Sequence, residues 1–393
     1  MSHRSIYCLS MILLLLGWSI PSQAQPSISG YYEHTLEVDY GEDVGEEFIL
    51  DLSKVRLDIN AGGGEGMFEF RSNVNFVQYH TGVTYDISPY LPDDVVQQLN
   101  LMGVGTQFQL EQSRIYLDNA FLTVNTGNMR FRAGKQQLSW GTGYSNNPTD
   151  LFHKKTLVDP SYEKEGVTAL RLDYRWGIGG NLSLITALGQ NFKDSGYAIR
   201  LGTHLSSIGY DIAMTTHHVV DSTMIDLTTF GPLLQNRDAL GLEFSGPFLG
   251  LGFWMEGNYN WMESEDDFAR VVTGMDFTFN NGLYVMVEGL VNMRQLWEPP
   301  YEISDWLSYM MYGEPVGRGW VIGAISKELS TLTSSSFYVF RAWDGGWMLN
   351  PRFEWSVAQN ADASFFAAMT FGPEDGAFPP GYYAGYARVT VYF

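Results

Sequence analysis

The chain of 393 residues contains 44 acidic and 23 basic side chains, which gives a net charge of −21. Its single cysteine, Cys8, lies in a predicted leader, which excludes a disulfide scaffold, a cysteine-ligated metal site and a thiol enzyme. No later stretch approaches 18 uninterrupted apolar residues, which excludes a helical membrane protein. With 15% aromatic residues, 42 glycines and 17% charged residues, the composition is typical of strands that alternate apolar with small or polar side chains.

Residues 1–24 are predicted to be an export signal. Arg4 lies in a short basic region, an apolar run covers 11–20, and Ser22 and Ala24 form a small-residue cleavage site. Cleavage there leaves 25–393, which we expect to be one domain. It removes one arginine and no acid, so 22 basic side chains remain against 44 acidic ones.

Eighteen segments of the mature chain alternate apolar and polar residues with a period of two, as half-buried strands do. In chain order they cover 29–40, 49–60, 65–79, 109–124, 128–140, 166–176, 180–190, 196–206, 208–219, 238–245, 250–262, 268–280, 283–294, 318–328, 332–344, 347–359, 363–371 and 382–393. The predicted fold is an all-β, transmembrane, antiparallel up-and-down β-barrel.

The lengths of the connections support this count. Short turns such as 125–127 and 281–282 follow the even-numbered strands, whereas long connections such as 80–108 and 141–165 follow odd-numbered ones. Short periplasmic turns that alternate with long outer loops are the pattern of outer-membrane barrels, and an even count leaves both termini in the periplasm. A strand merged or split in error would break the alternation, so we favour 18 strands, with 16 as the alternative.

Two long connections contain helical patterns. Residues 92–99 predict a short helix whose start is capped by an aspartate, and 301–312 predict a second helix. Each helix is either a lid over the pore or a decoration of its loop, and the sequence leaves both interpretations open.

The alternation also separates a lipid face from a lumen face. In 166–176, leucine and aromatic residues fill the later even positions, while Arg171, Asp173 and Arg175 fill the odd ones. An arginine or lysine on the lipid face costs roughly 2–4 kcal/mol at the bilayer midplane, so the charged face is the lumen. A charged interior is hydrated, and a barrel of about 16–18 strands is wide enough for an aqueous channel.

Charged residues on this face are expected to line the pore. They are Arg56, Arg71, Arg114, Arg130, Arg132, Arg171, Asp173, Arg175, Arg270, Arg294, Arg352, Glu354 and Arg388. The strands 128–140 and 166–176 carry the densest basic patch, with four arginines against one aspartate. Either these charges pair with one another and stiffen the wall, or unpaired arginines at a constriction select polar or anionic solutes.

The segment 132–152 carries the most distinctive local motif. It contains Gly134-Lys-Gln-Gln-Leu-Ser-Trp140-Gly, followed by Asn147-Pro148 and Asp150. It resembles a stretch shared by Gram-negative porin-like families, among them the alginate-export-like group of large barrels. The resemblance implies that a strand leaves the membrane at Trp140 and that the loop 141–160 folds into the pore. The alternative is a plain surface turn ordered by Pro148 and Asp150.

The closing strand 382–393 resembles the terminal strand that the barrel-assembly machinery of the outer membrane recognises. Val389, Val391 and the final Phe393 share one face of it. The resemblance implies that these residues form an assembly signal. The export signal and the alternating strands along the whole chain together indicate that the protein resides in the bacterial outer membrane, in contact with lipid and lipopolysaccharide.

The predicted function is that of a porin, a channel for passive or substrate-preferring diffusion of small polar solutes through a lumen lined by arginines and acids. Neither enzymatic activity nor a cofactor, a metal or a nucleic-acid partner is expected. Monomer and homotrimer are both open. One alternative is a structural or secretion-associated barrel without an open pore.

The second alternative is an outer-membrane barrel hydrolase. Its candidate bases are His34, His80, His153, His204, His217 and His218. No linear motif assembles a nucleophile and an orienting group around any of them. The adjacent His217 and His218 point to opposite faces of a strand, which makes the pair a poor metal site.

Overall fold

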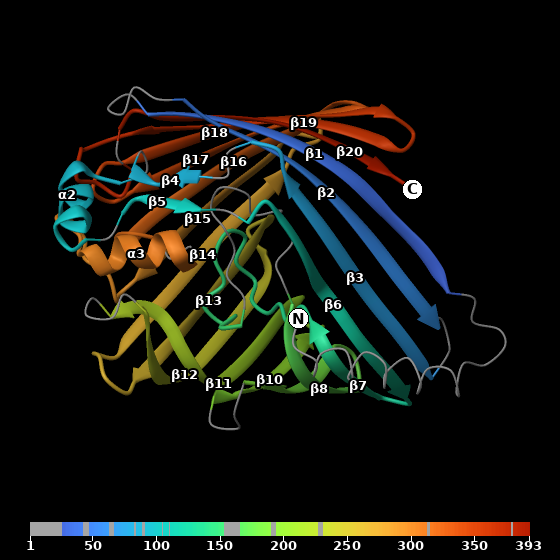
Figure 1. Cartoon of the computed structure of the whole chain (residues 1–393). Coiled ribbons are helices and arrows are strands. Elements are labelled where there is room, and N and C mark those ends of the chain that lie inside the picture. Colours follow the sequence, from blue (N-terminus) through green and yellow to red (C-terminus); the bar gives the residue numbers. More distant parts are fainter. Residues whose placement is uncertain are drawn as a thin grey trace, which may run out of the picture.

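In a computed structural model of the chain, the alternating segments form one closed barrel with tilted strands (Figure 1). The structure describes residues 26–41, 47–62, 67–81, 84–88, 91–103, 105–109, 111–152, 166–189, 194–226, 231–312, 315–378 and 380–393. The predicted export signal, 1–24, lies outside these residues. None of the described helices is long and apolar enough to cross a membrane.

Within the described residues, eighteen strands form the barrel wall, and each is antiparallel to its neighbours. They are β1 (Ser27–Gly41), β2 (Glu47–Gly62), β3 (Phe68–Tyr79), β6 (Ser113–Thr126), β7 (Met129–Gln136), β8 (Val167–Trp176), β9 (Gly180–Ala187), β10 (Gly196–Leu205), β11 (Tyr210–Asp226), β12 (Gly231–Phe248), β13 (Leu251–Met262), β14 (Phe268–Thr278), β15 (Tyr284–Asn292), β16 (Gly319–Ser330), β17 (Thr333–Ala342), β18 (Trp347–Ala358), β19 (Ala361–Phe371) and β20 (Tyr382–Tyr392). Each predicted segment overlaps one of these strands, which confirms the predicted count of 18.

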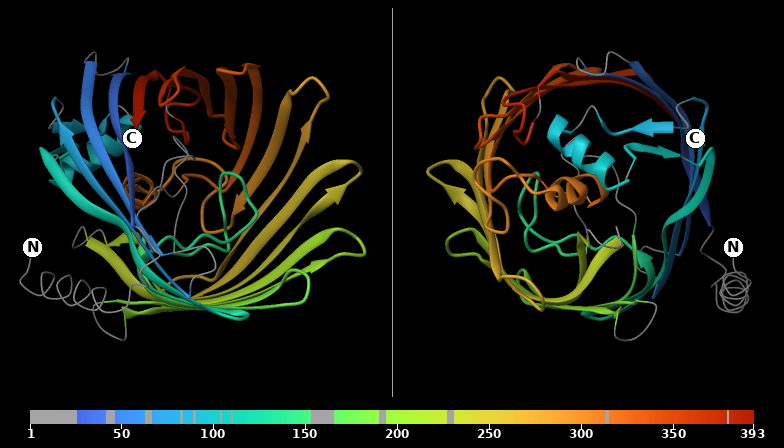
Figure 2. Two further views of the ribbon diagram at one scale, coloured as in Figure 1. Left: turned by 90° about the vertical axis from the view of Figure 1, so that its right-hand side faces the viewer. Right: turned by 60° about the vertical axis from the view of Figure 1, so that its left-hand side comes forward.

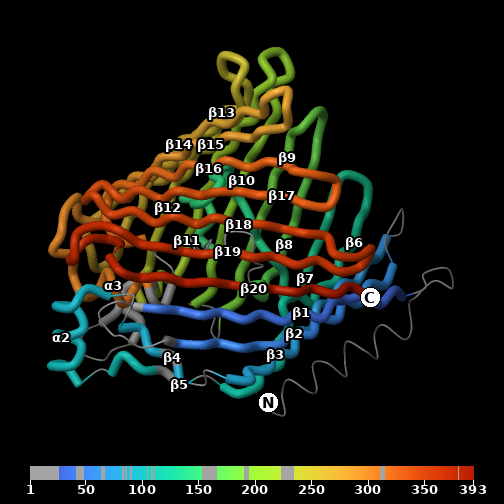
Figure 3. Tube along the Cα trace, turned by 90° about the horizontal axis from the view of Figure 1, so that it is seen from above, coloured from blue at the N-terminus to red at the C-terminus, as the bar shows by residue number. Residues whose placement is uncertain are grey.

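The barrel closes where the last strand meets the first, as the view from above shows (Figure 3). β20 pairs with β1 from Tyr392, opposite Tyr31, to Tyr382, opposite Gly41. Beyond the strand end, Phe393 and Gly30 exchange two backbone hydrogen bonds of 2.8 and 3.0 Å. Closure leaves the wall without an edge strand, so the strand backbones find partners inside the sheet, as a lipid environment requires.

Deletion of Phe393 is expected to reduce barrel assembly while export across the inner membrane continues. The deletion removes both terminal hydrogen bonds of the seam, and it removes a ring that is 62% exposed on the outer face beyond Val389. The measurement is the amount of heat-modifiable, folded protein in the outer-membrane fraction, with Phe393→Tyr as the control that keeps the ring. Unchanged amounts of folded protein in the deletion would show that the terminal residue is no assembly signal.

The strands place apolar side chains on the outer face and charged side chains on the inner face. On β8, Leu170 and Tyr174 are 42% and 39% exposed, whereas Asp173 is 7% exposed. A bulge keeps this division in β6, where the register shift opposite Asn73 leaves Asp118 as an extra residue. Asp118 is buried 3.6 Å from the guanidinium of Arg56.

The largest difference from the predicted bounds is in β11 and β12, which extend well past the predicted 208–219 and 238–245. Their pairing continues beyond a register shift between Asp221 and Met224. Buried polar residues, among them Asp221, Gln235 and Arg237, occupy the extension. On the outer face of this extension, His218, Asn236 and Asp238 take positions that apolar residues hold elsewhere on these strands, so the apolar half of the alternation fades before the strands end.

Two helices lie together across one end of the barrel, α2 (Asp93–Leu101) in cyan and α3 (Ile303–Tyr312) in orange (Figure 2). Val95, Leu99 and Trp306 belong to one buried apolar cluster that also contains Met286 of β15 and Trp320 of β16. The helices therefore pack onto the inner wall instead of standing free in their loops. A short hairpin, β4 (Thr84–Asp86) with β5 (Gln107–Gln109), flanks α2 in the chain.

Both predicted helices are present, but the predicted aspartate cap is wrong. The cap position of α2 is Pro92, and no side chain of the described residues caps it. Asp93 and Asp94 stand one and two residues later, in the first turn. The positive end of the helix dipole favours their negative charges in the first turn, and this interaction does not require a capping hydrogen bond.

Candidate functional site

The segment 137–152, which follows β7, lies inside the barrel (Figure 2, green). Leu138 and Trp140 are buried in an apolar cluster on the inner faces of β8, β9 and β10. Further along, the rings of Trp140 and Phe152 lie 5.4 and 5.7 Å from the ring of His217 on β11. The predicted inward fold of the loop 141–160 is confirmed for 141–152, and the alternative of a surface turn is wrong. Residues 153–160 lie outside the described residues.

Glu256, on β13, binds the backbone of this inward loop. Its carboxylate accepts hydrogen bonds from the N–H groups of Gly143 at 2.9 Å, of Thr149 at 3.0 Å and of Thr142. The side chain is 1% exposed. A buried carboxylate without such donors would cost several kcal/mol, so the loop and the glutamate stabilise each other.

Glu288, on β15, binds the part of the loop that lies between these donors. It accepts from the N–H groups of Tyr144 at 2.5 Å and Ser145 at 2.9 Å, and from the indole N–H of Trp254 at 2.7 Å. Glu243, on β12, accepts a hydrogen bond of 3.1 Å from the Thr149 hydroxyl. The loop is thus fixed to the wall from β12 to β15.

The loop also reaches β17. The hydroxyl oxygens of Tyr144 and Tyr338 lie 3.0 Å apart, and the two rings stack with centroids 6.4 Å apart. Together with the cluster on β8 to β10, these contacts show that the segment covers the inner wall over about half of the barrel.

On the other half of the wall, the lumen contains a cavity of about 550 Å³. Side chains of β1, β2 and β16 to β20 line it, and its charged residues are Glu33, Lys54, Glu328, Glu354, Asp362 and Arg388. Two of the residues predicted to line the pore, Glu354 and Arg388, lie here. The guanidinium of Arg388 is 3.8 Å from the carboxylate of Glu33, so the cavity presents acids and bases side by side.

The structure brings together the basic patch predicted on the fifth and sixth segments. In the pairing of β7 with β8, Arg132 stands opposite Arg171, and Arg130 stands opposite Asp173. Arg171 binds both carboxylate oxygens of Asp173 at 2.9 Å. Arg132 lies 4.5 Å from the ring centre of Phe121, and its Nε has no hydrogen-bond partner among the described residues.

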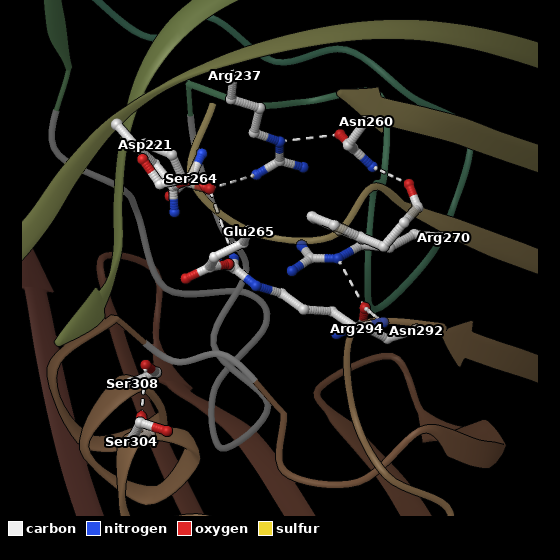
Figure 4. Close-up of polar contacts among 12 residues, drawn as sticks. Asp221, Arg237, Asn260, Ser264, Glu265, Arg270, Asn292, Arg294, Ser304 and Ser308 are labelled. Carbon is white, nitrogen blue, oxygen red and sulfur yellow. Dashed lines mark hydrogen bonds and ion pairs between the residues drawn. The ribbon is translucent and has the colours of Figure 1, made fainter. Parts of the chain in front are cut away.

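A second arginine cluster lies on the inner wall, at the ends of β12 to β15 that carry the long outer connections (Figure 4). The guanidinium carbons of Arg237, Arg270 and Arg294 lie 5.2, 5.3 and 5.2 Å from the ring centre of Phe268. Arg237 and Arg294 both pair with Asp221, at 3.3 and 3.5 Å. The cation–π contacts and the shared aspartate hold these charges against the wall.

Acidic and amide side chains complete this cluster. Glu265 pairs with Arg294 at 2.5 Å, and Asn292 accepts a hydrogen bond of 3.2 Å from Arg270. Asp305 lies in the first turn of α3, close enough to Arg294 to be influenced by its charge. Burial raises the pKa of Asp305 to about 6, and the charge of Arg294 opposes this shift.

The remaining residues of the predicted pore lining have partners along the wall. Arg56 binds Asp58 at 2.7 Å, Arg71 binds Glu69, Arg114 lies over the ring of Tyr116 at 4.6 Å, Arg130 donates to Asn125 at 3.0 Å, and Arg352 donates to Asn350 at 3.0 Å. Arg175 is exposed near the periplasmic turn after β8. That these side chains line a conducting path stays a prediction.

Sequence reasoning missed Arg237 and the anchoring role of the glutamates. The predicted strand 238–245 leaves Arg237 in a loop, although the alternation of Gln235, Arg237 and Ala239 continues the strand pattern. For Glu256 and Glu288 no local signal exists, because their donors in the inward loop lie 107 to 144 residues away in the chain.

The histidines that a hydrolase would need are spread over the barrel. His217 is buried, His204 pairs with Asp211 at 2.9 Å, His218 pairs with Asp238 at 2.8 Å, and His153 lies outside the described residues. His217 and His218 point to opposite faces, as predicted. His34 and His80 are neighbours, with ring centres 6.2 Å apart.

No protein-family description matches the sequence, and no curated protein matches it. Solved structures, in contrast, are similar over nearly the whole chain. OpdK of Pseudomonas aeruginosa, solved with vanillate, is 8% identical and has a TM-score of 0.62, covering 95% of this chain and 100% of that one. The chain has the fold of an outer-membrane porin.

Two further structures give the same result. OccAB1 of Acinetobacter baumannii is 7% identical with a TM-score of 0.61, covering 95% of this chain and 98% of that one. OccK9 (OpdG) of Pseudomonas aeruginosa is 10% identical with a TM-score of 0.61, covering 94% and 98%. Together with the apolar outer face, this fold places the protein in the bacterial outer membrane.

Proposed function

We propose that the protein is an outer-membrane channel for passive or substrate-preferring diffusion of small polar solutes. The observation that carries the proposal is the inward segment 137–152, which buried glutamates fix over one half of the wall while a charged cavity remains on the other half. A barrel plugged by its own loop would fill its lumen, whereas a charged cavity of about 550 Å³ remains beside this loop. In a channel such a loop sets the cross-section and aligns polar groups along the path.

The charges of the inner wall suggest which solutes pass. A polar solute that enters the cavity exchanges part of its hydration shell for acids and bases that lie side by side. At the periplasmic end, the arginine pair of β7 and β8 attracts anions over a Debye length of roughly 8 Å at physiological ionic strength. OpdK, which shares the fold, was solved with vanillate, and small organic anions belong to the proposed solute class.

Planar-bilayer recording on the purified, folded protein tests the proposal. We expect stepwise ion currents from heat-modifiable protein and none from the same preparation after heat denaturation. Swelling of liposomes that contain the protein, placed in solutions of neutral sugars of increasing size, would then give the size limit for solutes. Folded protein that inserts into the bilayer but carries no current would favour the structural barrel instead.

A further inference from the structure

A group of polar side chains interrupts the apolar outer face of the first three strands. His34 of β1, Asp51 of β2 and His80, directly after β3, each offer one ligand atom, and these atoms lie within 4.8 Å of one another. Nε2 of His34 is 3.6 Å from a carboxylate oxygen of Asp51. The residues come from consecutive strands whose register brings them together.

The group faces outwards. Tyr32 and Leu36, which flank His34 on the same face of β1, are 41% and 39% exposed, while Glu33 and Thr35 between them are buried. Ionisable side chains on the lipid face of a barrel are costly in a depth-dependent way. Two histidines and an aspartate in one place on that face therefore need a partner that offsets their desolvation.

Ser53 holds the two imidazoles in place. Its hydroxyl oxygen lies 3.2 Å from Nδ1 of His34 and 2.8 Å from Nε2 of His80. The Oδ1 atom of Asp51 is buried and has no hydrogen-bond partner among the described residues. The group thus combines two oriented imidazoles with one carboxylate oxygen that is left without a donor.

We propose that His34, Asp51 and His80 bind a divalent transition-metal ion, for which Zn²⁺ is the probe. Two imidazoles and one carboxylate form a common zinc ligand set with the fourth position open to water, and tetrahedral ligand atoms lie about 3.3 Å apart. The 3.6 Å between His34 and Asp51 is close to that value. His80 is exposed at the end of β3, so its ring can exchange the contact with the Ser53 hydroxyl for the ion and close the set.

Such an ion joins three consecutive strands next to the seam between β1 and β20. It also neutralises Asp51 on the lipid side. This role is independent of solute passage through the lumen.

The same neighbourhood contains a serine, a histidine and an aspartate, but a metal fits it better than hydrolysis. A serine nucleophile requires N–H donors aimed at the developing oxyanion. Ser53 lies in the middle of β2, which pairs with β1 on one side and β3 on the other. The N–H of Asp51 is bound to the Thr81 hydroxyl at 3.1 Å. The strands around Ser53 therefore use their donors in the sheet.

Calorimetric titration of the metal-free, folded full chain in detergent with Zn²⁺ tests the proposal. We expect one Zn²⁺ per chain, and binding that is weaker by about ten-fold or more in His34→Ala and in His80→Ala, because each variant loses a ligand. Co²⁺ in place of Zn²⁺ should give a visible absorption band that both variants lack. Absence of Zn²⁺ binding to the unmodified chain, or equal binding by all three proteins, would overturn the site.

Two control variants separate ligation from folding and from adventitious binding. His80→Gln can keep a hydrogen bond to Ser53 but is a poor zinc ligand, so it should fold normally and lose Zn²⁺. His218→Ala removes a histidine that is paired with Asp238 at 2.8 Å but belongs to no three-ligand group among the described residues, so it should bind Zn²⁺ as the unmodified chain does. Equal loss in His218→Ala would assign the bound ion to histidines in general and not to this group.

Discussion

Replacement of Glu256 and Glu288 by glutamine together is expected to release the inward loop and raise the single-channel conductance. Both oxygens of each carboxylate accept hydrogen bonds from loop N–H groups or from Trp254. Glutamine keeps one acceptor oxygen and turns its NH₂ group, a donor, towards the other N–H groups. Each lost hydrogen bond to a charged acceptor lowers the free energy that holds the loop on the wall by about 1.5–3 kcal/mol. Conductance in planar bilayers and protease cleavage within 137–152 measure the release.

Glu354→Gln is the matched control for this double variant. It makes the same Glu→Gln substitution on the inner wall and removes one of the two charges that the double variant removes, but Glu354 lines the open cavity and accepts a hydrogen bond of 3.1 Å from the Ser334 hydroxyl instead of from the loop. We expect the loop to stay protected from protease in this control. If the double variant is equally protected and conducts as the unmodified chain does, the aromatic contacts of Trp140 and Phe152 hold the loop and the glutamates do not.

The barrel could be predicted from the sequence because its signals are local. A period of two is visible within each strand, and the alternation of short and long connections checks the count without any knowledge of pairing. The predicted bounds fell short where the outer face changes character. At His218, Asn236 and Asp238 polar residues replace apolar ones on that face, so the strands continue after its apolar pattern ends.

The candidate site was predictable only where its parts come from neighbouring strands. The patch of Arg132 and Arg171 requires nothing beyond the alternation and the pairing of two consecutive strands. The contacts of Glu256 and Glu288 join the loop after β7 to strands more than 100 residues further on. Such contacts depend on the curvature of the whole barrel, which no local pattern encodes.

Replacement of both Arg132 and Arg171 by alanine is expected to shift the ion selectivity of the channel towards cations. The two guanidinium groups start from directly opposed positions on β7 and β8. Asp173 neutralises the charge of Arg171, whereas Arg132 stacks on Phe121 and its positive charge faces the lumen. The double change therefore removes a free positive charge and also exposes the carboxylate of Asp173. The reversal potential in a KCl gradient measures the shift.

Two single variants decide where the selectivity originates. Lys327→Ala removes a positive charge that lies between Ile325 and Leu329 on the outer face, and it should leave the reversal potential unchanged. Glu374→Gln removes an exposed acid from an outer connection, and its effect should be small because screening over roughly 8 Å separates the rim from the periplasmic end of the lumen. A reversal potential that responds to Glu374→Gln but not to the arginine changes would assign selectivity to the acidic outer loops, and the basic patch would then be a part of the wall without a role in permeation.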